Sequence, residues 1–172
     1  IGALDGTSEF AKGQIDEVRI WRRARTQAEL QATMRTTLTG KEAGLAVYLP
    51  FDQGEGPAGL DMTSRGAHAV FTGGAAWTDQ AAPLQACATS DGTGQAFKVE
   101  ASKPGVPANT ALAFTGTTNA VRVANVPTAG DELTISYWFR GTSLQSAVRQ
   151  QINANFVVAG WNGMHILSND GG

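Results

Sequence analysis

The most regular segment of the chain is 132–139, ELTISYWF, in which large apolar residues occupy every second position. The apolar positions are Leu133, Ile135, Tyr137 and Phe139, and the positions between them are Thr134, Ser136 and Trp138. Successive residues of a β-strand face opposite sides of its sheet. The period of two therefore predicts a strand with one apolar face.

Further β-forming segments recur along the chain, separated by turns rich in glycine, which makes up 21 of the 172 residues. The expected strands are 14–21, 45–51, a short one within 68–77, 111–114, 120–123, 155–161 and 165–168. We expect 111–114 and 120–123 to form a hairpin-like pair. Residues 78–109 read as a long loop with one short strand around Ala96–Val99. About eight strands and one helix imply an all-β fold, an antiparallel β-sandwich.

The one expected helix follows the first strand, at about residues 27–35. Thr26 and Glu29 have the S/T-x-x-E spacing of a capping box. In this motif the Thr side chain accepts a hydrogen bond from a free amide of the first turn, and the Glu side chain accepts one from the cap amide. A helix this short is not stable alone, so it must pack on the rest of the fold.

Charge and composition exclude several classes of protein. The formal net charge is −2, which leaves no basic excess for binding a nucleic-acid backbone by bulk charge. Hydrophobic residues make up 42% of the chain, enough to build a packed core. No apolar run approaches the roughly 20 residues that span a bilayer. The composition therefore predicts a globular chain with no nucleic-acid partner and no membrane span.

Three segments together resemble laminin-G-like domains of the concanavalin A-like lectin/glucanase superfamily. Residues 9–31, EFAKGQIDEVRIWRRARTQAELQ, resemble the last strand of such a domain and the short helix after it. Residues 44–77, beginning GLAVYLPFDQGEG, resemble the opening of the domain, and residues 111–140 resemble its next segment. Each motif alone is weak, whereas three with family-like spacing are more specific. The resemblance implies a jelly-roll sandwich.

The order of these motifs predicts the domain organisation, because the closing motif comes before the opening one. Residues 1–36 would be the closing strand and helix of one domain, 37–43 a linker, and 44–172 the front part of a second domain with a loop-rich insertion at about 78–109. A sandwich without its remaining strands would leave apolar faces and edges open. We therefore expect the missing strands to come from a continuation of the chain, from a neighbouring copy or from residues 14–21. In the family the first and last strands lie side by side, so the resemblance implies that 14–21 pairs with 45–51 or 111–114, within one chain or between chains.

The resemblance also implies a possible Ca²⁺ site, because some members of the family bind calcium near the closing strand and an Asp-Gly turn. The matching positions are Asp16 and the turn 115–119, with Asn119 as the second candidate metal ligand. Thr115 and Asn119 stand where the family has two aspartates, and the loss of two charges would weaken a cation site. The alternative is that Asp16 is a structural hydrogen-bonding residue.

Candidate ligand-binding residues lie in two places. Asp52, Glu55 and Asp61 fall in one glycine-rich loop, where they could accept sugar hydroxyls or hold a cation, or simply form turns. Trp161 and Asn162 lie beside glycine at a strand end, where an indole can stack on a sugar ring or pack in the core. The family matches Trp138 with a buried position.

Nothing in the sequence forms a catalytic motif. A nucleophile elbow, a metal-binding H-E-x-x-H and a phosphate-cradling glycine motif are all missing from it. We expect a non-catalytic module of a secreted or cell-surface repeat protein that serves adhesion, carbohydrate binding or fibre assembly. Its partners would be glycans, or neighbouring copies or domains joined by strand pairing. The alternative is an accessory carbohydrate-binding domain of a glycoside hydrolase or sialidase-like enzyme.

Overall fold

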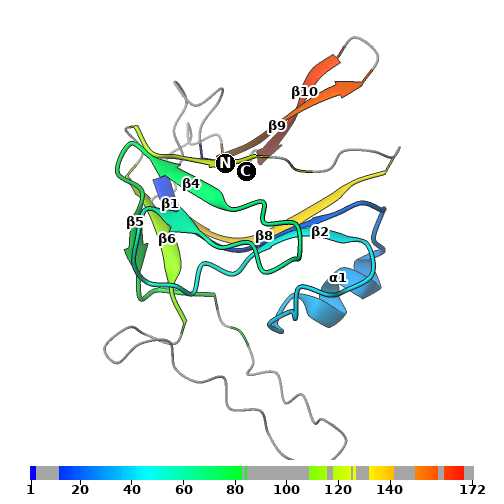
Figure 1. Ribbon diagram of the computed structural model, residues 1–172, viewed down its shortest axis with the longest axis horizontal. Helices are drawn as coiled ribbons and strands as arrows, with labels where there is room; N and C mark the ends of the chain where they lie inside the picture. The colour runs from blue at the N-terminus through cyan, green and yellow to red at the C-terminus, as the bar shows by residue number, and fades with distance from the viewer. Residues whose placement is uncertain are drawn as a thin grey trace, which may run out of the picture.

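The computed structural model describes residues 1–2, 12–82, 84, 109–115, 118–124, 126, 132–141, 150–158 and 161–168, and from residue 141 onward the backbone alone. Its elements are β1 (Lys12–Trp21), α1 (Gln27–Thr33), β2 (Leu45–Leu49), β3 (Ala58–Gly59), β4 (Ala69–Thr72), β5 (Ala76–Thr78), β6 (Ala111–Thr115), β7 (Ala120–Val123), β8 (Thr134–Gly141), β9 (Gln150–Val158) and β10 (Trp161–Ser168). The prediction of an all-β chain with one short helix is confirmed at this level (Figure 1). The jelly-roll arrangement stays a prediction.

Strand β1 is the centre of the larger sheet. One of its edges pairs with β8, and the other pairs first with β6 and then with β2, all antiparallel. Strand β5 extends this sheet beyond β6. The expected pairing of 14–21 with 45–51 or 111–114 is therefore confirmed within one chain, and both partners are used at once.

A second sheet has the order β3-β4-β7, and β9 pairs with β10 in a separate two-stranded sheet. The hydrophobic core joins the first two sheets. It combines Ile15, Val47, Leu112 and Phe114 of the larger sheet with Ala69 and Val121 of the smaller one. Phe51 lies among them, fully buried, and contacts the rings of Phe71 and Trp77, which also contact each other.

Two local predictions were wrong because neighbouring segments of the chain belong to different sheets. The first is the hairpin-like pair of 111–114 and 120–123. Strands β6 and β7 do not pair with each other, because β6 pairs with β1 and β5 while β7 pairs with β4. The Asn119 side chain accepts from the backbone amide of Thr115 at 2.6 Å and donates to Gly73 at 2.6 Å. This bond to a distant loop turns the chain from one sheet into the other.

The region 68–77 likewise forms two strands rather than one, because β4 and β5 belong to different sheets. The turn between them contains Gly73, with a φ of +67°, where a Cβ would lie 1.7 Å from the carbonyl oxygen of Thr118. Only glycine permits this crossing. The strand expected around Ala96–Val99 lies outside the described residues.

The capping box at the start of α1 is confirmed, and Glu29 and Thr26 exchange the expected hydrogen bonds. The helix ends at Thr33, two residues earlier than expected. Its end is held by Arg19 of β1, which donates to the carbonyl oxygens of Thr33 and Thr36 at 2.6 Å each. A side chain of the sheet therefore caps the helix, since no glycine follows it there.

Arg19 belongs to a buried polar network at an irregularity of β1. Glu17 has a φ of +55°, and the pairing with β8 shifts register between Asp16 and Arg19. The Glu17 carboxylate forms an ion pair with Arg19 and accepts from the Tyr48 hydroxyl at 2.9 Å. All three side chains are buried. The Tyr48 hydroxyl in turn accepts from the backbone amide of Leu38.

This network predicts a large loss of stability for Arg19→Met. The variant leaves the Glu17 carboxylate buried without its counter-ion, so the free energy of unfolding should fall by about 3–5 kcal/mol. Arg23→Met is the matched control, because the Arg23–Glu29 pair is 42% and 33% exposed. Its loss should cost far less, because an exposed ion pair contributes little to stability. Urea unfolding of both variants measures the difference, and equal small losses would contradict the role given to Arg19.

Candidate functional site

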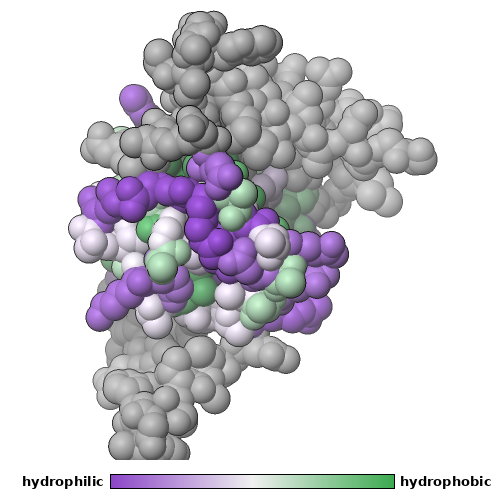
Figure 2. Space-filling model, turned by 90° about the vertical axis from the view of Figure 1, so that its right-hand side faces the viewer, coloured by the Kyte–Doolittle hydropathy of each residue, from purple (hydrophilic) through white to green (hydrophobic). Residues whose placement is uncertain are grey.

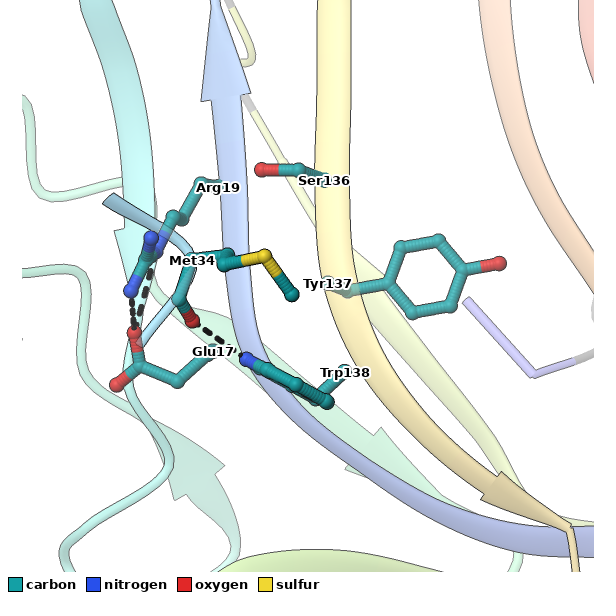
Figure 3. A pocket seen from close by; sticks show the side chains of 6 residues that line it. All are labelled: Glu17, Arg19, Met34, Ser136, Tyr137 and Trp138. Atoms are coloured by element: carbon teal, nitrogen blue, oxygen red, sulfur yellow. Dashed lines mark hydrogen bonds and ion pairs between the residues drawn. The ribbon is translucent and has the colours of Figure 1, made fainter. Parts of the chain in front are cut away.

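A hollow of about 190 Å³ lies between the end of α1 and the outward face of β8. Its lining residues come from β1, from β8 and from the residue that follows α1: Glu17, Arg19, Met34, Ser136, Tyr137 and Trp138. Figure 3 shows the ion pair of Glu17 and Arg19 on one side of the hollow and Tyr137 pointing away to the other face of β8. The rest of the wall is made by the Trp138 indole, the Met34 thioether and the Ser136 hydroxyl.

The position of Trp138 is fixed by its neighbours. Its indole N–H donates to the Met34 carbonyl oxygen at 2.7 Å, which ties β8 to the end of α1. The Arg35 guanidinium lies 5.9 Å from the centre of its ring. Met34 itself is 38% exposed. The described part of the face drawn in Figure 2 is mostly hydrophilic, with separate hydrophobic areas between the polar ones.

The charged groups beside the hollow are already satisfied. Burial raises the pKa of Glu17, and the neighbouring Arg19 guanidinium and Tyr48 hydroxyl act in the opposite direction. Burial also raises the pKa of Tyr48. Arg19 directs its donors to Glu17 and to two backbone carbonyls. The hollow therefore combines a satisfied ion pair with the side chains of Met34, Ser136 and Trp138.

A second group of titratable residues lies farther along β1. Burial raises the pKa of Asp16 to about 7, against the effect of a hydrogen bond from Ala82, and the charges of Glu17 and Asp52 raise it further. Asp16 accepts from the backbone amides of Glu17 at 2.9 Å and Ala82 at 2.7 Å. Burial likewise raises the pKa of Asp52 to about 6, although Asp52 accepts from the Thr110 amide.

The two predicted metal ligands do not lie together. Lys12 of β1 faces Thr115 of β6, and Ile15 faces Leu112, so Asp16 lies near the opposite end of β6 from Thr115. Asn119 is hydrogen-bonded to Thr115, which faces Lys12. From Lys12 to Asp16 is four residues along β1, or about 13 Å at 3.3 Å per residue. Within the described residues, no group of three His, Cys, Asp or Glu side chains could hold a metal ion. The pair Asp16 and Asn119 does not fit one calcium ion.

The predicted ligand-binding residues Asp52 and Asp61 make different contacts within the protein. Both oxygens of Asp61 are used, because Asp61 accepts from the amides of Tyr48, Thr63 and Ala67 and from the Thr63 hydroxyl. These bonds fasten the loop 61–67 to β2. Asp52 instead contacts Thr110. Trp161 and Asn162 lie on β10, and their side chains fall outside the described part of the structure.

Sequence reasoning missed the residues around the hollow. Trp138 was expected at a buried position, but its ring lies at the wall of the hollow against Met34. The role of Arg19 had a visible signal, since one arginine stands between Val18 and Ile20 in the apolar second half of the strand. A charge at such a place needs a buried partner. Tyr48, the partner of Glu17, lies in another strand and had no local signal.

Comparisons with protein-family models, with curated proteins and with solved structures found no match. In the described residues, no helix combines the length and hydrophobicity that a membrane crossing requires. The geometry of the site therefore carries the functional argument.

The raised pKa values predict how stability depends on pH. Asp16 and Asp52 hold protons more tightly in the folded chain, so the free energy of unfolding should fall as the pH rises from 3.8 to about 7. Asp52→Asn keeps an oxygen for the Thr110 amide and removes one titrating group. Between pH 3.8 and about 6, the free energy of unfolding of this variant should therefore fall by about 1–2 kcal/mol less than that of the wild type, a figure that allows for screening by solvent.

Urea unfolding of the wild type and of Asp52→Asn in acidic and in mildly alkaline buffer tests this expectation. Parallel profiles for the two proteins would contradict it.

The placement of Asp16 also predicts the effect of a chelator. A cation at Asp16 would compete with two backbone amides for the same oxygens, and Asn119 is too far away to help. We therefore expect EDTA to leave the melting temperature unchanged. A bound ion at 100–1,000 times its dissociation constant would stabilise the fold by about 3–4 kcal/mol. A clear drop in melting temperature on chelation, reversed by added calcium, would contradict this expectation.

Proposed function

We propose that this chain is a non-catalytic β-module whose function is to assemble with neighbouring β-segments of a secreted or cell-surface repeat protein. In this proposal the two sheets are the layers of a jelly-roll sandwich, and β1 is its closing strand. The observation that carries the proposal is that one edge of strand β8 is left without a pairing strand. Along one edge β8 pairs with β1, and in the described part of the chain no strand pairs with its other edge.

The apolar face of β8 supports the same role. Three of its side chains, and that of Leu133 just before it, are only partly buried against the core; the three are Ile135, Tyr137 and Phe139. A long strand with a free edge and an apolar face is a template for pairing with another chain. An added strand would gain backbone hydrogen bonds from the edge and would bury these side chains.

The other face of β8 offers a place for selectivity. Ser136 and Trp138 line the hollow there, beside Met34. In strand addition the alternate side chains of the incoming segment reach both faces of the sheet, and pockets for them give specificity. Asp52 accepts from the Thr110 amide, and Asp61 accepts from amides of β2 and of its own loop, so these oxygens are used within the protein and we favour assembly over carbohydrate recognition.

Tyr137→Lys tests this function. The substitution places a charge in the partly buried face of β8, so it should abolish concentration-dependent association, which sedimentation velocity and light scattering measure. Val70→Lys is the matched control, because Val70 is 55% exposed on β4 of the other sheet. That variant should associate like the wild type. A wild type that stays monomeric at every concentration, or equal loss in both variants, would refute the proposal.

A further inference from the structure

The central strand of the larger sheet comes from the beginning of the chain, whereas all of its partners come later. Strand β1 pairs with β8 over almost its whole length, with β6 at Lys12–Ile15 and with β2 at Val18–Trp21. Without β1, strand β8 would have no partner among the described strands, and β2 would be separated from β6. Strand β8 on one side and strands β6 and β2 on the other therefore leave a gap one strand wide, which β1 fills. We call this gap the slot.

Strand β1 and helix α1 form one unit. Arg19 binds the carbonyl oxygens of Thr33 and Thr36, so the end of the helix is fastened to the strand. The network then crosses to the slot, because Tyr48 of β2 binds Glu17 and the amide of Leu38. The Glu17, Arg19 and Tyr48 side chains of this network are thus present either on this unit or on β2, one of the strands that receive it.

The connection between the unit and β2 can act as a hinge. Residues 39–44 contain Gly40 and Gly44, both with positive φ, and Glu42 accepts from the amide of Thr39 within the same turn. Fully extended, these six positions reach about 20 Å, which is enough to bring the unit to an adjacent molecule. A short hinge that is held in a tight turn favours exchange between copies.

We propose that β1 and α1 of one copy of this chain occupy the slot of a second copy, so that Glu17 and Arg19 of one molecule complete the network of Tyr48 in the other. Such an exchange remakes the same contacts and costs little beyond association. Reciprocal exchange gives a closed dimer. The inference rests on the proposed function and names the donated segment and its recipient.

Disulfide trapping tests the exchange. Gln14 and Arg140 face each other across β1 and β8. Cross-strand neighbours have Cβ atoms about 4.5–5.5 Å apart, close to the spacing of a disulfide. In a Cys87→Ser background, we would refold a mixture of Gln14→Cys chains and Arg140→Cys chains of different tag length at high concentration. We expect a covalent heterodimer on a non-reducing gel, increasing with concentration during refolding.

Two controls make the result decisive. Both substitutions in one chain should give a disulfide-linked monomer on refolding at low concentration, which shows that the pair can form. Gln14→Cys mixed with Ser136→Cys is out of register, because Ser136 faces Arg19, and should give no more than background dimer. A linked monomer from the double variant, with the heterodimer no higher than this background, overturns the exchange.

The trapping experiment and the Tyr137→Lys experiment test different claims, so failure of the exchange can be told apart from failure of the assembly function. If the heterodimer is missing while the wild type associates through β8, the exchange is wrong and the assembly function stands. If the heterodimer forms while Tyr137→Lys associates like the wild type, the free edge of β8 is not the assembly surface and the exchange stands.

Discussion

The buried contact of Glu17 with Arg19 and Tyr48 determines how the larger sheet is built. Glu17 has a left-handed backbone conformation, which costs about 1–3 kcal/mol for a residue with a side chain. The irregularity turns both charged side chains toward Tyr48 and the helix. In return the carboxylate gains an ion pair and a hydroxyl donor. The strain is therefore offset by satisfied polar groups at the same point.

The positions of α1 and of the hollow follow from this contact. Arg19 fixes the carbonyl groups of Thr33, the last residue of α1, and of Thr36 beyond it, and Trp138 of β8 fixes that of Met34. The helix end is thus held from two neighbouring strands. The hollow between them is the space left where β8 passes the irregular part of β1, and its shape depends on the register shift between Asp16 and Arg19.

Features set by neighbours in the sequence could be predicted, and features set by distant contacts could not. Alternation located β8, and the Thr26–Glu29 spacing located the start of α1. The turn between β6 and β7 looked like that of a hairpin, because the bond from Asn119 to Gly73 joins loops far apart in the chain. Asp61 looked like a ligand in a glycine-rich loop, yet backbone amides occupy its oxygens. Trp138 could not be placed at the hollow without knowing where α1 ends.

The polar network also bears on which strand the slot accepts. A purely apolar strand could pair with β8, β6 and β2, but it would leave the Tyr48 hydroxyl without the carboxylate that accepts its hydrogen bond. An unsatisfied buried polar group costs about 1–3 kcal/mol, and a strand with the carboxylate but no arginine would leave a buried charge unpaired. Discrimination by such penalties is stronger than discrimination by apolar area alone. A slot closed by Glu17 and Arg19 therefore selects a second copy of this chain, or a segment with the same two charges at the same irregularity, over other β-strands.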